Sequence, residues 1–320
     1  MKNQNQFRRK LGFAAFSLLF LTVLYFFGFM WLEFDSNHKA SGFALLGQTL
    51  PLAAVIIFIS FLLRYARWHG LINKAGYSVR ISEGLLAYLA GFAFTASPGK
   101  AGELVRCRYF SAFGVPVRTT FAAFLYERSM DLLVVLALSA LALWASSLFI
   151  PAAAFVLLVL GILIAIARWG HWIEKRGILG QESIILSASR FIRGGVDDCR
   201  VWLNPSDLLV SAAMGIMAWS LVCAAFIWVL SFLGIMLPLS LSFSLYPMAM
   251  LAGAASMIPG GIGTTEAAIV LLLSSAGVSI EQAALAALGI RVATLWFAMV
   301  CGLVSVFILE LRNGKTTTSI

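Results

Sequence analysis

Three charged residues lie close together inside an apolar part of the chain. The stretch FLYERSMD places Glu127, Arg128 and Asp131 within an apolar run over residues 120–148. At the centre of a membrane helix each charge costs about 2.5–3.5 kcal/mol, so three without partners would cost roughly 8–10 kcal/mol. Glu127 and Asp131 share a helix face, and Arg128 reaches Asp131 at a spacing of three. The spacing predicts either a structural ion-paired cluster or one that leaves Arg128 to bind a phosphate.

Two further apolar regions, 84–112 and 243–277, are each interrupted near the middle by a Pro-Gly pair, in SPGKAGE and IPGGIGTTE. Proline stops a helix because it lacks an N–H donor and clashes with the preceding turn, while glycine allows positive φ and close backbone approach. Each half has about 12–16 residues, too few to cross a hydrocarbon core of about 30 Å, so we expect two re-entrant helical hairpins. The residues of the predicted breaks are Pro98, Gly99, Gly102, Pro259, Gly260, Gly261 and Gly263.

Each break would point a helix amino terminus into the membrane. Free N–H groups and the positive end of the helix dipole favour an anion there, such as a lipid phosphate. Glu103 and Glu266 follow the breaks and are expected in the first helical turn, and Thr264 or Thr265 could cap the second helix. The two glutamates either satisfy the helix ends themselves and leave no ligand site, or release an arginine when substrate arrives.

The two halves of the chain carry these features in the same order. Arg128 lies 25 residues after Glu103, and Arg291 lies 25 residues after Glu266. With a period of about 160 residues, each half holds three spans and one hairpin, so the second half must be inverted, as in many secondary transporters. We expect Arg128 and Arg291 to bind a phosphate headgroup, each from its own side of the membrane, because guanidinium binds phosphate bidentately.

The elements that must position these residues are membrane helices. Of the 320 residues, 61% are hydrophobic and 12% are charged, against about 45–50% and 25% in soluble domains. We predict an all-α polytopic membrane protein with six transmembrane helices and two re-entrant hairpins in an inverted repeat. The spans are expected at about 11–31, 43–63, 120–148, 152–167, 208–235 and 283–309. Residues 1–320 form one membrane domain, with repeats at 11–150 and 151–310 and a cytoplasmic tail at 311–320.

The basic residues predict how the chain is oriented. If both hairpins are re-entrant, Lys39 is the one lysine or arginine of the connecting segments that falls on the far side. This predicts cytoplasmic amino and carboxyl termini and a bacterial inner (plasma) membrane location. The net charge of +9 then follows from topology and membrane electrostatics, and no nucleic-acid partner is expected. RYARW at residues 64–68 is interpreted as an interfacial anchor.

Several kinds of site have no support in the sequence. The four cysteines show no CxxC spacing and the three histidines lie far apart, so neither a disulfide framework nor a metal site is expected. There is no GxxxxGK[ST] sequence for ATP. We expect no cofactor and no catalytic residues, so transport must run down a gradient or be coupled to ions.

Several motifs together resemble one known family. RYARWHGLINKAG, SPGKAGELVR, ERSMDLL, IPGGIGTTEAA and the GIR of 289–291 occur in that order. They resemble the lysylphosphatidylglycerol synthase transmembrane, or flippase-like, family over about residues 10–310. The resemblance implies translocation of an anionic or lipid-linked substrate between leaflets, aminoacylated phosphatidylglycerol in the best-known member and polyprenyl-linked sugars as a further class. Because this sequence shows no soluble aminoacyltransferase domain, aminoacyl transfer is not expected.

Three functions remain open from the sequence. The first is a flippase without ATP, in which the headgroup slides between the two halves. The second is a membrane transferase at the inner face, in which Arg106, Arg108 and Glu103 hold a phosphate. Glu127 or Asp131 would then be the base. Duplication of the key residues in opposite orientations favours the first, and a small-solute or ion transporter would use the same architecture. Membrane lipids are the expected partners, and the protein partners considered are a second copy and a separate lipid-modifying synthase or glycosyltransferase.

Overall fold

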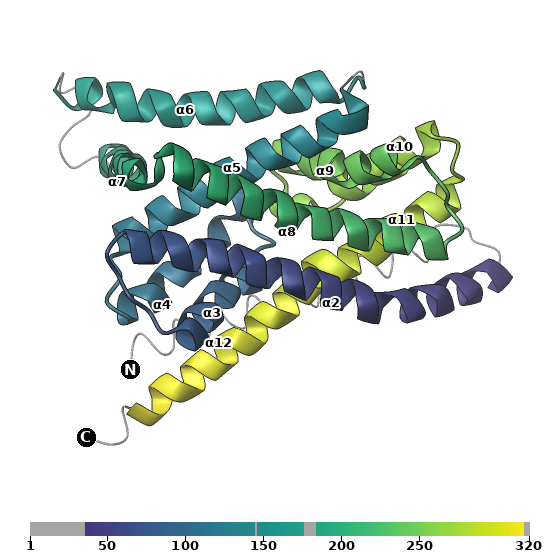
Figure 1. Ribbon diagram of the computed structural model, residues 1–320, viewed down its shortest axis with the longest axis horizontal. Helices are drawn as coiled ribbons and strands as arrows, with labels where there is room; N and C mark the ends of the chain where they lie inside the picture. The colour runs from purple at the N-terminus through teal and green to yellow at the C-terminus, as the bar shows by residue number, and fades with distance from the viewer. Residues whose placement is uncertain (1–35, 145, 176–183, 317–320) are drawn as a thin grey trace.

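The structure is a computed structural model that describes residues 36–144, 146–175 and 184–316, and this part of the chain is built from helices joined by turns (Figure 1). The longer helices are α2 (Ser36–Lys74), α5 (Val117–Leu143), α6 (Phe149–Lys175), α7 (Ile184–Asp198), α8 (Pro205–Phe232), α9 (Leu239–Ala255) and α12 (Phe297–Thr316). The shorter ones are α3 (Ile81–Ala90), α4 (Arg106–Ala112), α10 (Thr264–Ser275) and α11 (Ile280–Arg291). Between them lie the 3-10 segments η1 (Gly91–Phe94), η2 (Pro98–Val105), η3 (Cys199–Trp202) and η4 (Pro259–Gly261), and the π-helical η5 (Val292–Trp296).

Four helical stretches of the described residues are long and apolar enough to cross a membrane. They are Gly47–Lys74, Phe149–Ile166, Pro205–Phe232 and Ile280–Arg312, the last of which joins α11, η5 and α12. Each overlaps a predicted span, whereas the predicted span 11–31 lies outside the described residues. α5 covers most of the predicted span 120–148 but is not among the four, because every 18-residue stretch of it contains Glu127, Arg128 and Asp131. The chain is therefore a helical membrane protein whose α5 is charged at its middle.

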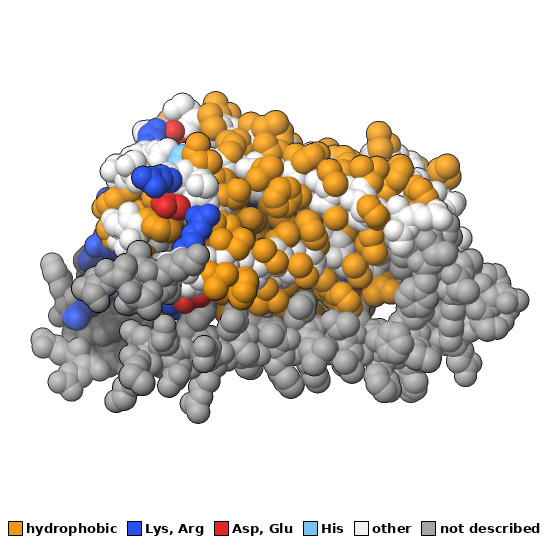
Figure 2. Space-filling view, turned by 90° about the horizontal axis from the view of Figure 1, so that it is seen from below, with side chains coloured by type: hydrophobic (Ala, Val, Ile, Leu, Met, Phe, Trp, Pro, Cys, Tyr) orange, Lys and Arg blue, Asp and Glu red, His pale blue; other side chains and the backbone are white. Residues whose placement is uncertain are grey.

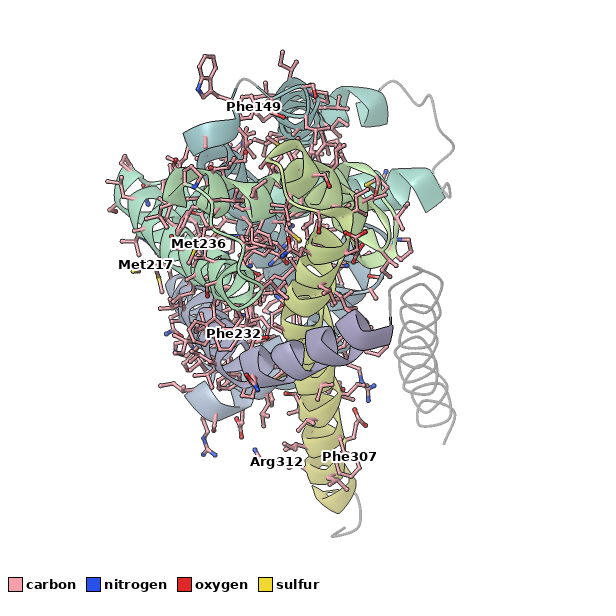
Figure 3. The ribbon with its side chains drawn as sticks, turned by 90° about the vertical axis from the view of Figure 1, so that its right-hand side faces the viewer. Phe149, Met217, Phe232, Met236, Phe307 and Arg312 are labelled. Carbon is pink, nitrogen blue, oxygen red and sulfur yellow. The ribbon has the colours of Figure 1, made fainter. Side chains whose placement is uncertain are left out.

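The outer surface is apolar over most of its extent. In Figure 2 hydrophobic side chains cover most of the described surface on that face, and charged side chains gather at its left end. Met236 is 84% exposed and Phe307 is 60% exposed, and Figure 3 shows both side chains on the outside of the bundle. A soluble protein rarely exposes apolar surface of this extent, but a lipid environment favours it.

The two broken segments contact each other inside the bundle. α2 and α8 lie side by side, α9 packs on α5, and α12 crosses α3 and η1 (Figure 1). Within this frame η2 contacts η4, and a Cβ atom added to Gly260 would lie 3.4 Å from the Cα of Ala96. The two Pro-Gly breaks therefore lie next to each other.

The first break is longer than the sequence predicted. Residues Pro98–Val105 adopt 3-10 geometry, and the α-helix that follows begins only at Arg106. Glu103 therefore lies in the 3-10 segment, and the expectation that it occupies the first turn of an α-helix is wrong. The break folds back tightly, since a Cβ atom at Gly102 would lie 2.3 Å from the carbonyl oxygen of Phe94. Only glycine fits at that position without displacing backbone.

The second break depends on left-handed glycines. Gly260, Gly261 and Gly263 have φ values of 65°, 64° and 80°, a region that costs other residues about 1–2 kcal/mol. Glu266 does lie in the first turn of α10, as predicted. The predicted threonine cap is absent among the described contacts, because Gly263 is the N-cap and Thr264 instead donates to the carbonyl of Gly261 at 3.1 Å.

Candidate functional site

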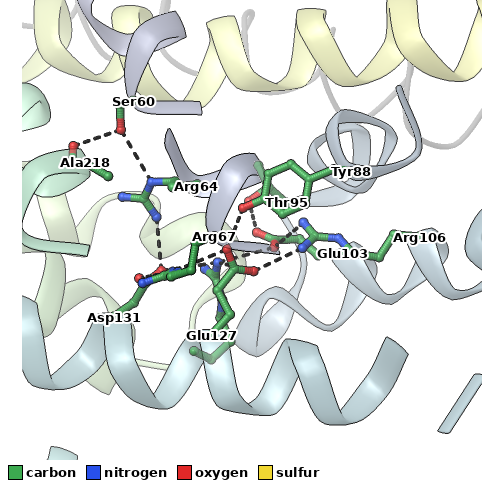
Figure 4. A network of polar contacts seen from close by, with 11 residues as sticks. Ser60, Arg64, Arg67, Tyr88, Thr95, Glu103, Arg106, Glu127, Asp131 and Ala218 are labelled. Atoms are coloured by element: carbon green, nitrogen blue, oxygen red, sulfur yellow. Dashed lines mark hydrogen bonds and ion pairs between the residues drawn. The ribbon is translucent and has the colours of Figure 1, made fainter. Parts of the chain in front are cut away.

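Four arginines and three carboxylates form one buried network beside the first break (Figure 4). The residues are Arg64 and Arg67 of α2, Glu103 of η2, Arg106 of α4, and Glu127, Arg128 and Asp131 of α5. Buried charges of this kind persist only when they are paired and hydrogen-bonded, because desolvation of an isolated ion costs several kcal/mol. The network therefore joins three helices and one break through charge pairing.

Glu127 is the most enclosed carboxylate of the network and is fully buried. Its Oε1 accepts a hydrogen bond from the Tyr88 hydroxyl at 2.6 Å and a longer one from Arg67 Nη2 at 3.4 Å. Its Oε2 accepts from Arg106 Nη1 at 3.2 Å. Donors on α2, α3 and α4 thus converge on one side chain of α5 and hold it in place.

Asp131 links α5 to α2. Arg67 Nη2 donates to it at 2.7 Å and Arg64 Nη1 donates at 3.0 Å. Arg128 Nη2 lies 3.3 Å from Asp131, which is the contact predicted from their spacing. Glu127 and Asp131, predicted to share one helix face, are both bound by Arg67.

Arg106 joins the first break to α5. Its Nη2 donates to Glu103 at 3.0 Å and its Nη1 donates to Glu127 at 3.2 Å. The guanidinium carbon lies 4.3 Å from the ring centre of Tyr88 and 4.8 Å from that of Trp68, within cation–π range. Arg106 is fully buried, so it does not present its charge at the surface, where the transferase hypothesis requires it.

The second break has a smaller ion pair of its own. Arg291 Nε lies 2.5 Å from Glu266 Oε1, and its Nη2 donates to the carbonyl of Gly260 at 2.6 Å. The five residues after Arg291 form the π-helical η5, in which Thr294 donates to Ile290 and accepts from Tyr246. Short π-helical segments occur frequently at functional sites because they reposition a side chain within a helix.

Arg128 and Arg291 line the same cavity. The cavity is partly open and measures about 90 Å³, and residues from both broken segments line it. Space of this size accommodates on the order of six water molecules. Its polar lining residues are Arg64, Thr95, Glu103, Arg128, Tyr246, Arg291 and Thr294. From the sequence, Arg128 and Arg291 were expected to act from opposite sides of the membrane. In the structure they line one cavity.

Arg128 is charged, but its ion pairs with the carboxylates of the network are 3.3 Å or longer. Its Nη2 lies 3.3 Å from Glu127 and from Asp131 and 4.0 Å from Glu103. Neither its Nε nor its Nη2 finds a hydrogen-bond acceptor within the part of the chain that the structure describes. Its side chain is 18% exposed and faces the cavity. A guanidinium that lines a cavity and is partly exposed there is suited to binding an anionic oxygen.

The contribution of α2 to the network was not predicted from the sequence. Arg64 and Arg67, interpreted as interfacial anchors, are 8% and 3% exposed and bind Asp131. The available signal was their spacing of three residues on a helix, which places both on one face. Across the described residues, no group of three or more histidine, cysteine, aspartate or glutamate side chains is arranged to hold a metal ion.

Comparison with known proteins identifies the family. The sequence profile described as lysylphosphatidylglycerol synthase TM region matches residues 10–302, which include both breaks and every residue of the network. Comparisons with curated proteins and with solved structures found no significant match. The chain belongs to the lysylphosphatidylglycerol synthase TM region family.

Proposed function

We propose that this chain is a lipid flippase that moves an anionic or phosphate-linked lipid between the leaflets. The observation that supports this most is the shared cavity, because an arginine paired with each break lines it. In this proposal residues 11–150 and 151–310 are inverted repeats with six spans and two re-entrant hairpins. The protein lies in the bacterial inner membrane with both termini cytoplasmic, and it acts alone, as a homo-oligomer, or with a separate lipid-modifying synthase or glycosyltransferase.

The headgroup would be held by charge while the acyl chains remain in lipid. Its phosphate enters the cavity and binds Arg128 and Arg291, whose planar groups match phosphate oxygens. Glu103 and Glu266 hold these arginines in the empty state and release them to the substrate. The apolar side chains that complete the lining are compatible with a lipid backbone: Ile57, Phe61, Val222, Met250, Leu295 and Ala298.

The breaks would act as the gates. Gly260, Gly261 and Gly263, which have positive φ, can absorb the φ/ψ change of a hinge, and Gly260 contacts Arg291 directly. Alternating access then consists of one broken segment moving away from the other, first toward one leaflet and then toward the other.

The transferase hypothesis has less support. Its proposed bases, Glu127 and Asp131, each accept hydrogen bonds from two arginines. Each oxygen of these two carboxylates already accepts a hydrogen bond within the protein, so neither is poised to take a proton from a substrate. The flippase proposal uses these two groups only to position Arg128.

The proposal can be tested in proteoliposomes with lipids that carry a fluorescent acyl chain. We expect labelled phosphatidylglycerol to reach the other leaflet, and Arg128→Gln and Arg291→Gln each to slow it at least about tenfold, since a charge-assisted hydrogen bond is worth about 1.5–3 kcal/mol. Arg118→Gln is the matched control, because Arg118 pairs with Asp198 at the surface and does not line the cavity. Absence of lipid movement in the wild type, or unchanged rates in both cavity variants, would refute the proposal.

A further inference from the structure

We propose that the headgroup taken by this cavity is a compact anion without a cationic group, so that lysyl-esterified lipids are poor substrates of this chain. The inference rests on the proposed function and narrows its substrate class. It follows from three properties of the cavity, which are its charge balance, the engagement of its acidic and aromatic groups, and its size.

The charge balance around the cavity is positive. The described network and the second ion pair contain five guanidinium groups and four carboxylates, which leaves one positive charge in excess. The arginines are Arg64, Arg67, Arg106, Arg128 and Arg291, and the acids are Glu103, Glu127, Asp131 and Glu266. A phosphodiester brings one negative charge and neutralises the excess. A lysyl ester of phosphatidylglycerol brings two ammonium groups with that phosphate and would increase it, at a cost that burial makes larger.

The acidic side chain of the described lining and the face of one of its aromatic residues already hold arginines. Glu103 is the acidic side chain among the described lining residues, and it accepts hydrogen bonds from Arg106 at 3.0 Å and from Thr95 at 3.1 Å. The aromatic face of Trp219 has the Arg64 guanidinium carbon 4.5 Å from its centre. An ammonium would have to displace one of these cations to gain this carboxylate or the face of Trp219.

The size of the cavity favours the same class. A space of about 90 Å³ between the two breaks suits a phosphate with a small polar group. A lysyl ester adds a whole amino acid to that group, and its amines would be placed against the apolar side chains of Phe61, Val222 and Met250. Burying an unpaired ammonium there costs several kcal/mol.

The first test compares lipids in one proteoliposome preparation. We expect labelled phosphatidic acid and phosphatidylglycerol to move at least about ten times faster than labelled lysylphosphatidylglycerol. Comparable movement of the lysyl lipid overturns the inference and leaves the flippase proposal standing. If none of the lipids moves, the flippase proposal fails, and binding decides the inference separately. Water-soluble dihexanoyl phosphatidylglycerol should then raise the thermal unfolding midpoint of the detergent-solubilised chain more than its lysyl ester does, and equal shifts overturn the inference.

The second test removes the excess positive charge. Met250 lines the cavity and has nearly the volume of glutamate, so Met250→Glu adds a carboxylate with little change in packing, and Met250→Gln is the neutral control. We expect Met250→Glu to shift the rate ratio of the two lipids toward the lysyl form by about tenfold relative to Met250→Gln. Thr294→Asp places a carboxylate at another position of the lining and should act in the same direction if Met250→Glu does not fold. An unchanged ratio in the variant that folds overturns the inference.

Discussion

Replacing Arg128 with glutamine should leave the protein nearly as stable as the wild type, whereas Arg106→Gln should destabilise it strongly. The network of four arginines and three carboxylates holds one excess cation. Arg128 contributes ion pairs at 3.3–4.0 Å, but its Nε and Nη2 have no hydrogen-bond acceptor among the described residues. Arg106 donates two hydrogen bonds and is fully buried. The two substitutions remove the same charge and therefore form a matched pair.

The expected magnitudes follow from these contacts. Arg106→Gln removes two hydrogen bonds to charged groups, each worth about 1.5–3 kcal/mol, and its cation–π contacts with Tyr88 and Trp68. Removing one partner of a buried ion pair costs about 3–5 kcal/mol, and we expect a loss in that range. Arg128→Gln removes an excess charge and leaves each neighbouring carboxylate with another arginine partner, so we expect a loss well below that range.

The assay measures both stability and transport. Unfolding of the detergent-solubilised chain in a denaturant titration, followed by tryptophan fluorescence, gives the free energy of unfolding for wild type and both variants. Lipid translocation is measured on the same preparations, and we expect Arg128→Gln to lose it while remaining folded. If Arg128→Gln is destabilised as much as Arg106→Gln, Arg128 is a structural pin and the assignment of a phosphate-binding role to it is refuted.

Four further predictions concern other parts of the molecule. Gly302→Ala should lower the free energy of unfolding by about 1–3 kcal/mol, because its Cβ would lie 2.1 Å from the backbone nitrogen of Ala93. Gly161→Ala, with no described atom within 4 Å of the added Cβ, should be neutral or stabilising by up to about 1 kcal/mol in the same titration. Met257→Gly should raise the unfolding midpoint, with a gain of up to about 1 kcal/mol, because Met257 has φ 55° and is exposed; a lower midpoint would contradict this. Burial raises the pKa of the Cys199 thiol to about 12, so its maleimide labelling should be slow at pH 7.5 and accelerate as the pH rises; fast labelling at neutral pH would show that the site opens.

The residue types along the chain were enough to predict the breaks and the long helices that position the site. Proline and the glycines around Pro98 and Pro259 predicted two interruptions, and both are present as short 3-10 segments. The apolar runs predicted the long helices, with four stretches able to span a membrane. The expectation for Glu103 was wrong because a 3-10 helix differs from an α-helix only in bonding three residues along instead of four. The sequence alone does not show where one geometry changes to the other.

The partners of the charged residues were not predictable in the same way. The spacing within FLYERSMD predicted the contact between Arg128 and Asp131, since both lie on one helix. Arg67 contacts Glu127 across 60 residues and Asp131 across 64, and Arg64 contacts Asp131 across 67. Helical periodicity places residues on a face but carries no information about which helix packs against that face.

By itself the sequence determined that this chain is a helical membrane protein, where its helices break, and that the charges inside it need partners, water or an interface. These properties depend on hydropathy, on proline and glycine, and on the cost of burying charge, all of which act locally. Only the tertiary structure decided that α2 supplies two of the arginines and that Arg128 and Arg291 line one cavity. Contacts between distant segments arise when whole helices pack, and that packing sets which charge meets which partner.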